Sequence, residues 1–225
     1  MTYAVTISGS PSAASRSARL LRFVESELVG AGIEVRRIDV RALSPAALLA
    51  ADASHDDLRY ALAQVAGAQA VVVATPVYKA AYSGLLKAFL DVLPQDGLAG
   101  KLVAPFATGG SPAHLLALDY ALKPVLSALG AQHILRGVFA VDQQVPKEEG
   151  AALDAAIADR LGANVDQLSQ WLHEREVIRQ WPARAAGGIH DSSRAPGAPN
   201  GNGPGGLNGP NEPNARSANR ATLAA

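Results

Sequence analysis

The chain has 225 residues, 20 basic and 20 acidic side chains, no cysteine and a hydrophobic content of 48%. This length suits one domain with a core large enough to need no disulfides, and the lack of cysteine excludes disulfides and thiolate metal sites. The zero net charge argues against a nucleic-acid-binding protein, which usually carries a basic excess. No apolar run reaches the roughly 18 residues of a membrane span, and no signal peptide is evident, so we expect a cytoplasmic protein.

The composition changes after Trp181-Pro182. Residues 183–225 contain 8 Gly, 5 Pro and 6 Asn and almost no large apolar side chain. Such a segment buries too little apolar surface to offset its chain entropy, so we expect a folded domain over residues 1–182 and a disordered Gly/Pro/Asn-rich tail over residues 183–225. The tail takes four Arg and two acidic residues, which leaves 16 basic and 18 acidic residues in the domain.

Short apolar runs alternate with longer segments of helical spacing along the domain. The apolar runs are Ala4–Ser8, Ile33–Ile38, Ala70–Thr75, Leu102–Ala107 and Ile134–Val141, and the helical segments are Ser15–Gly30, His55–Ala66, Gly84–Leu93, Ala113–Leu129 and Glu148–Glu176. This alternation predicts an α/β fold with a parallel sheet and helices on both faces. Five such units suit a flavodoxin-like, five-stranded sheet in the order 2-1-3-4-5, whose ligands bind beyond the carboxyl ends of the strands.

The segment after the first predicted strand, Ser8–Ser17, places several hydroxyls at the start of an amphipathic helix. It matches neither the dinucleotide fingerprint nor the Walker loop, which argues against a dinucleotide or a triphosphate as ligand. Free N–H groups and the helix dipole favour an anion here, and Arg16 adds a positive charge. Ser15 as a plain N-cap is the alternative, although capping explains one serine of this segment and leaves the other four unexplained.

Two further loops follow the third and fourth predicted strands. Thr75–Gly84 carries Val77, Tyr78 and Tyr82, and such an aromatic ledge suits a flat heteroaromatic ring; packing under the loop or at a subunit contact is at least as good an interpretation. Thr108–Ser111 contains paired glycines, which let a backbone approach a ligand closely but also serve as a plain turn. Together the three loops indicate one phosphate and one planar ring, as in a mononucleotide such as FMN.

Three stretches carry a resemblance to a known family: GSPSAASRSARLL, ATPVYKAAYSGLLKAFLDVLP and ATGGSPAHLLALDYALKPVLSALGA. They resemble the NADPH-dependent FMN reductase family, most closely the branch that supplies the alkanesulfonate monooxygenase of a two-component system. The similarity runs over about residues 3–143, and the second and third stretches are the specific ones.

The resemblance implies that NADPH, or NADH, reduces FMN and that FMNH2 leaves for a flavin-dependent monooxygenase, such as one for alkanesulfonate desulfonation in sulfur assimilation. The residues it assigns to the FMN phosphate are Ser10, Ser15, Arg16 and Ser17. Those it assigns to the isoalloxazine ring are Pro76, Val77, Tyr78 and Lys79 on one side and Thr108, Gly109 and Gly110 on the other. Ser12 stands where relatives often carry Arg, which removes one phosphate contact.

The helix that follows the fourth strand should be irregular near Tyr120. Pro124 has no N–H, so the carbonyl of Tyr120 loses its usual partner, and a kink or a single-turn π-bulge is expected. The resemblance implies a homo-oligomer, a dimer or a tetramer, with a tyrosine inserted in a π-helix at its interface. Leucines on more than one face of this helix agree with a second contact, although a doubly buried helix within a monomer is the alternative.

Two other functions stay open. One is a quinone or azo reductase that retains FMN, and the other is a non-enzymatic flavodoxin-type electron carrier, which usually finds its partners through an acidic surface that this near-neutral chain lacks. No catalytic side chain is predicted, because the flavin carries the chemistry. His173-Glu174 lacks the second histidine of a zinc motif, and His114 at a helix start is more often solvated, so we expect no metal site.

Overall fold

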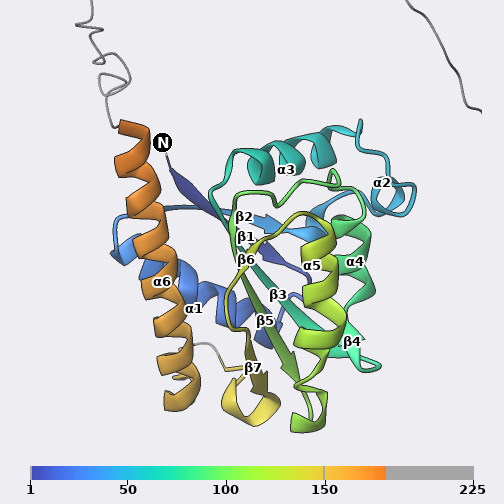
Figure 1. The fold of residues 1–225 in the computed structure, drawn as a ribbon. Coiled ribbons are helices and arrows are strands. Elements are labelled where there is room, and N and C mark those ends of the chain that lie inside the picture. The colour runs from blue at the N-terminus through green and yellow to red at the C-terminus, as the bar shows by residue number, and fades with distance from the viewer. Residues whose placement is uncertain (1, 149, 181–225) are drawn as a thin grey trace, which may run out of the picture. The chain divides into compact units, whose positions relative to one another are not determined.

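The computed structural model describes residues 2–148 and 150–180, and the predicted tail over residues 183–225 lies outside them. Figure 1 shows a central sheet with helices on both sides. The elements in chain order are β1 (Tyr3–Ser8), α1 (Arg16–Gly30), β2 (Glu34–Asp39), η1 (Val40–Ala42), α2 (Pro45–Leu49), α3 (Asp56–Gly67), β3 (Ala70–Tyr78), β4 (Ala81–Tyr82), α4 (Gly84–Leu90), β5 (Leu102–Gly109), η2 (Pro112–His114), η3 (Leu118–Leu122), α5 (Lys123–Ala128), β6 (His133–Ile134), β7 (Val138–Val141), η4 (Asp142–Gln144) and α6 (Ala155–Gln180).

The sheet has the predicted doubly wound order. Its main path is β2-β1-β3-β5-β6, and β7 pairs with β5 as well. All of these pairs are parallel, so the flavodoxin-like order 2-1-3-4-5 is confirmed, with β6 and β7 together in the fifth place. The strand count differs from the five expected, because the sheet has seven strands.

The two extra strands have separate physical causes. The predicted fifth strand, Ile134–Val141, is broken into β6 and β7, which pair with β5 on either side of Pro105. Proline has no N–H to donate to a ladder, so pairing lapses beside it. The other extra strand, β4, pairs antiparallel with the end of β3 and makes a hairpin of the segment that the sequence predicted as a loop.

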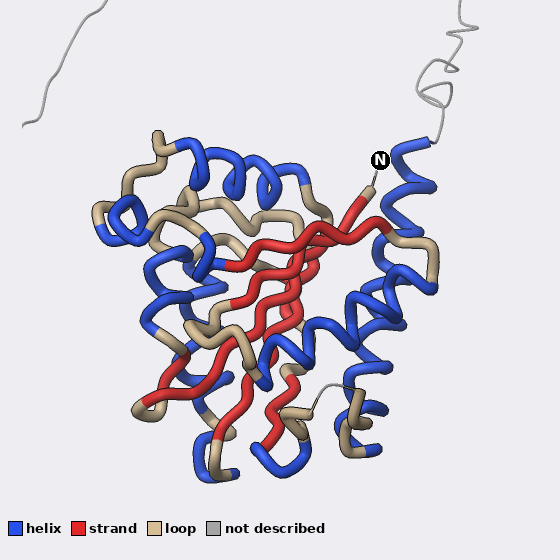
Figure 2. The backbone as a smooth tube through the Cα atoms, turned by 180° about the vertical axis from the view of Figure 1, so that it is seen from behind, coloured by secondary structure: helices blue, strands red, loops and turns tan. Residues whose placement is uncertain are grey.

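Side chains from the two faces of the sheet form two cores. Alternate residues of β1 and β3 point to opposite sides, as the period of a strand requires. On one side they pack with α1 and α6, and on the other with α2, α3, α4, η3 and α5. Figures 1 and 2 show this three-layer arrangement, which leaves the loops at the carboxyl ends of the strands free to form a site.

The helix predicted over Ala113–Leu129 is divided, and the irregularity near Tyr120 is confirmed. A short 3-10 turn, η2, precedes the π-helix η3, and α5 begins only at Lys123. The backbone N–H of Lys123 donates to the carbonyl of Leu118, five residues earlier. Pro124 accounts for the change in register because it cannot supply the bond that a regular helix would form there.

The last helix begins later than predicted. The expected span was Glu148–Glu176, whereas α6 covers Ala155–Gln180. The carboxylate of Asp154 accepts from the backbone N–H of Ile157 at 3.3 Å, as an N-cap does. Carbonyls of the preceding segment accept hydrogen bonds from Arg19 instead of helical N–H groups. Within residues 2–148 and 150–180, no helix combines the length and apolar character that crossing a bilayer requires.

The side chain of Lys101, directly before β5, caps the carboxyl end of α3. Its buried ammonium donates to the carbonyls of Ala66 at 2.9 Å and Ala68 at 2.8 Å. Lys101→Met leaves both carbonyls without this partner, and we expect the free energy of unfolding to fall by ~1–3 kcal/mol in urea titrations. An unchanged value would show that water replaces the ammonium at no cost.

The same variant has a pH signature. Burial lowers the pKa of Lys101 below its ordinary value of 10.5, so the unfolded chain binds more protons than the folded one in the range just below pH 10.5. The contribution of Lys101 to stability therefore rises with pH across that range. We expect the difference in unfolding free energy between the parent protein and Lys101→Met to grow as the pH approaches 10.5.

Candidate active site

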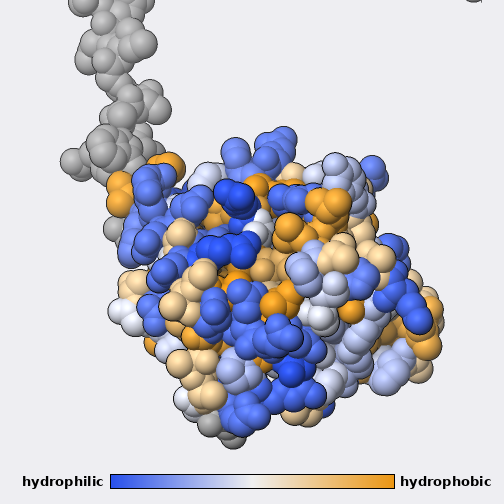
Figure 3. Space-filling model, turned by 90° about the horizontal axis from the view of Figure 1, so that it is seen from below, coloured by the Kyte–Doolittle hydropathy of each residue, from blue (hydrophilic) through white to orange (hydrophobic). Residues whose placement is uncertain are grey.

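A cavity of about 270 Å³ opens beyond the carboxyl ends of the strands, the ends that lie at the bottom of the sheet in Figure 1. Four segments line it, which follow or end β1, β3, β5 and β7. The lining residues are Ser10, Ser12, Ala14, Ser15, Arg16, Pro76, Val77, Tyr78, Thr108, Gly109, Gly110, Asp142 and Lys147. Figure 3 views this side of the molecule and shows hydrophilic side chains interspersed with smaller hydrophobic areas.

The three predicted loops therefore converge. All of the predicted binding residues line this cavity except Ser17 and Lys79. Ser17 is fully buried, and its Oγ lies 2.8 Å from Oγ of Ser15, so it supports a lining residue from behind. Lys79 lies at the exposed tip of the β3–β4 hairpin.

The loop after β1 holds its hydroxyls at the start of α1. Ser15 is the N-cap, and its Oγ accepts from the backbone N–H of Ala18 at 3.3 Å. Ser15 thus has the capping role that the sequence left as an alternative, and it also lines the cavity. The first turn of α1 reads Arg-Ser-Ala-Arg, without an acidic residue that would offset the positive end of the helix dipole. This wall of the cavity suits an anion.

One wall of the cavity is formed by Pro76–Tyr78, the end of β3, which is the first strand of a tight hairpin with β4. The two turn residues of this hairpin, Lys79 and Ala80, have positive φ angles of 50° and 63°. Positive φ at both positions suits the twist of a two-residue hairpin, but it is uncommon for residues other than Gly or Asn. Glycine, the usual sign of such a turn, is missing, so the sequence indicated a loop. The hairpin fixes Val77 opposite Tyr82 and makes the ledge a piece of sheet.

Ser83 joins two walls of the cavity, and sequence reasoning missed it. Its buried hydroxyl donates to the carbonyl of Gly9 and accepts from the backbone N–H of Leu86 at 3.1 Å, as the N-cap of α4. Its own N–H donates to Oγ1 of Thr75 at 3.0 Å. The signal available in the sequence was a serine directly before a helical segment. These bonds hold the loop after β1 against the hairpin.

The fourth wall, with Asp142 and Lys147, also escaped prediction, because the strand-order rule points only to the loops beside the reversal of strand order. Nη1 of Arg16 lies 3.1 Å from Oδ2 of Asp142, and Nε of Arg16 donates to the carbonyl of Val145 at 2.9 Å. Arg16, predicted as a phosphate ligand, thus lines the cavity as one half of an ion pair.

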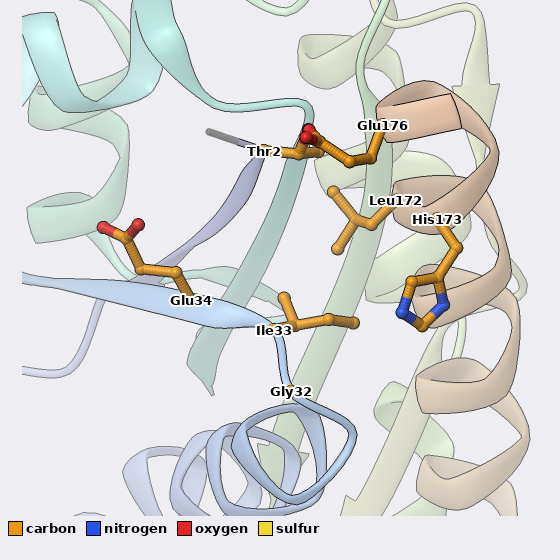
Figure 4. Close-up of a pocket in the computed structure, with 7 residues that line it drawn as sticks. All are labelled: Thr2, Gly32, Ile33, Glu34, Leu172, His173 and Glu176. Atoms are coloured by element: carbon orange, nitrogen blue, oxygen red, sulfur yellow. The ribbon is translucent and has the colours of Figure 1, made fainter. Parts of the chain in front are cut away.

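Another cavity, of about 380 Å³, lies at the opposite edge of the sheet. Its lining residues are Thr2, Gly32, Ile33, Glu34, Leu172, His173 and Glu176. The hydroxyl of Thr2 donates to Glu176, and Figure 4 shows Glu34 and His173 on opposite sides, with Ile33 and Leu172 between them. These residues lie at the amino ends of β1 and β2 and on α6, apart from the converging loops.

The fold and the cavity together define the class of protein. It is a flavodoxin-like α/β protein with a cavity beyond the carboxyl ends of its strands, which is where flavodoxin-like proteins bind a flavin mononucleotide. The sequence pattern described as NADPH-dependent FMN reductase matches residues 2–146. The chain belongs to this family, and it is an oxidoreductase that uses FMN and a nicotinamide nucleotide.

Curated relatives and a solved structure support this assignment. The chain is 47% identical over 174 residues to an FMN reductase (NADPH) of Escherichia coli K12, which covers 77% of this chain and 91% of the relative. It is 49% identical over 174 residues to an FMN reductase (NADPH) of Pseudomonas putida KT2440, with 76% and 88% covered. The apo crystal structure of the NADH:FMN oxidoreductase EmoB has 43% identity and a TM-score of 0.71, with 76% and 90% covered.

Proposed function

We propose that the protein reduces FMN to FMNH2 with NADPH, or with NADH, in the cytoplasm and delivers FMNH2 to a flavin-dependent monooxygenase such as one that desulfonates alkanesulfonates. The observation that carries the reductase part is the convergence of a hydroxyl-rich helix start and a hairpin ledge on one cavity. The monooxygenase rests on the sequence resemblance, and its identity is the finer part of the proposal.

The residues fit FMN in two parts. Ser10 and Ser15, at the positive end of α1, would hydrogen-bond the phosphate, and Pro76–Tyr78 would lie against the ring. On the other side a Cβ placed on Gly110 would meet no described atom within 4 Å, so the backbone there is open to close approach. When bound, FMN supplies the ring that accepts a hydride. The chain itself binds and orients the flavin and keeps water from one side of it.

The decisive test follows NADPH oxidation at 340 nm while free FMN is varied. A rate that saturates with FMN supports a reductase that treats FMN as a substrate, whereas the absence of FMN-dependent turnover contradicts the proposal. The colour of the purified protein separates the alternatives further. A yellow protein that turns over quinones or azo dyes indicates retained flavin, and one that binds FMN without oxidising NADPH indicates an electron carrier.

We also propose that η3 lies at the interface of a homo-oligomer. Its Tyr120 is 78% exposed, and Leu116, in the turn before it, is 56% exposed, so η3 and this turn present apolar surface that a second copy would cover. Tyr120→Ala is expected to shift the protein to a smaller species in analytical ultracentrifugation. Tyr60→Ala, on α3 and 70% exposed, is the matched control and should leave the species unchanged. An identical shift, or none, for both variants would contradict this interface.

A further inference from the structure

The charges that line the candidate active site are unequally available. Among the described residues, three charged side chains line the cavity: Arg16, Asp142 and Lys147. Arg16 is engaged twice, by the carboxylate of Asp142 at 3.1 Å and by the carbonyl of Val145 at 2.9 Å. Its positive charge is therefore offset by a carboxylate in the same cavity, and two of its donor groups are directed toward the segment after β7.

Lys147 is in the opposite situation. Within the described part of the chain, no hydrogen bond or ion pair involves its side chain, and the residue is exposed at the cavity. Its backbone is nevertheless held on both sides, because Nη1 of Arg19 donates to the carbonyls of Pro146 and Glu148, to the latter at 2.7 Å. The fold thus presents an uncompensated ammonium from a fixed backbone position.

Such a group suits a phosphate monoester. The monoester carries a charge of about −1.5 to −2 at neutral pH, and the serine hydroxyls and the start of α1 supply hydrogen bonds and only a partial positive charge. The Arg16–Asp142 pair adds almost no net charge. We propose that Lys147, rather than Arg16, is the cation that binds a phosphate monoester in this cavity, an inference that rests on the proposed function.

Two ligands of the proposed reaction carry this chemistry: the 5′-phosphate of FMN and the 2′-phosphate of NADPH. Each has a natural counterpart without the group, riboflavin for FMN and NADH for NADPH. A cation that contacts this phosphate strengthens binding of the member of each pair that carries it and leaves binding of the other member unchanged. The ratio of the affinities for FMN and riboflavin, and the ratio of those for NADPH and NADH, therefore report on a contact between Lys147 and a phosphate. General damage to the cavity would change both members of each pair.

The experiment compares Lys147→Gln with the parent protein. The Kd values for FMN and riboflavin are measured by quenching of flavin fluorescence, and the KM values for NADPH and NADH by turnover with FMN. We expect Lys147→Gln to raise the Kd for FMN by about threefold to tenfold, as the loss of one charge-assisted contact does. The Kd for riboflavin should stay within about twofold, since the contact is made to the phosphate alone.

Two further variants serve as controls. Lys147→Arg keeps the charge and should restore most of the discrimination between FMN and riboflavin. Lys87→Gln removes the same charge from α4, where Lys87 pairs with Asp91 away from the cavity, and should leave all four constants unchanged. If Lys87→Gln reproduced the effect of Lys147→Gln, net charge would explain the result and the proposal would be overturned.

The remaining outcomes are distinct. A change in the NADPH-to-NADH ratio with an unchanged FMN-to-riboflavin ratio supports the proposal and assigns Lys147 to the 2′-phosphate. Unchanged ratios for both pairs, in a protein that binds and reduces FMN, overturn the proposal and leave the proposed function intact. A parent protein that binds neither FMN nor riboflavin contradicts the proposed function, and the role of Lys147 falls with it.

Discussion

Replacing both Ser15 and Ser17 with alanine is expected to raise the Kd for FMN by more than about tenfold, which corresponds to ~1.4 kcal/mol of binding free energy. Ser15 lines the cavity, and its hydroxyl lies 2.8 Å from that of Ser17. The double variant removes the group proposed to contact the phosphate together with the neighbour that orients it. Quenching of flavin fluorescence gives the Kd directly.

The double variant also removes the N-cap of α1, so a loss of stability must be separated from a loss of binding. Ser44 provides the control, because its hydroxyl caps α2 by accepting from the backbone N–H of Ala47 at 3.3 Å, and it does not line the cavity. Ser44→Ala should cost a comparable ~1 kcal/mol of stability and leave the Kd for FMN unchanged. An unaltered Kd in the double variant would refute the phosphate assignment.

Gly9→Ala is expected to lower the free energy of unfolding by ~1–3 kcal/mol, as overpacking of a core does, and to weaken FMN binding several-fold. A Cβ at this position would lie 2.7 Å from Cβ of Leu86, which is closer than side chains tolerate. The backbone cannot easily move away, because the N–H of Gly9 donates to the carbonyl of Ala74 at 2.8 Å and its own carbonyl accepts from Ser83. A shift would displace Ser10, which lines the cavity next to it.

Urea titrations measure the stability, and Gly30→Ala is the matched control. A Cβ on Gly30, at the end of α1, would meet nothing within 4 Å among the described residues, so that variant should stay within ~1 kcal/mol of the parent. Equal stability of Gly9→Ala and Gly30→Ala, with unchanged slopes in urea, would show that Leu86 yields to the added methyl group.

Sequence reasoning reached the parts of this protein that depend on local pattern. The buried strands are recognisable in the sequence as apolar runs. The order of the sheet follows from the alternation of these runs with helical segments. The π-helix follows from Pro124, because the missing N–H acts on the turn directly before it. The convergence of three loops on the candidate cavity follows from the rule that loops at the carboxyl ends of strands near the reversal of strand order carry the ligand.

The parts that escaped depend on contacts between distant residues. The turn at Lys79 and Ala80 has positive φ without glycine, so no local signal marked the hairpin. The composition of the segment after β7 does not indicate that it lines the cavity, because hydrogen bonds from Arg16 and Arg19 of α1 hold it there. The same contacts explain why α6 starts later than its helical pattern suggests.

The contacts of Arg19 have a consequence for how the protein is made. They join Arg19 to residues that lie 127, 129 and 132 positions later in the chain. The loop after β1 is made early, and the cavity beside it is complete only once the segment after β7 has been made and has folded. Such non-local closure is slow compared with the formation of helices. A nascent chain that has folded β1, α1 and β3 therefore presents the hydroxyl-rich loop without its opposite wall, and the cavity is completed late in biosynthesis.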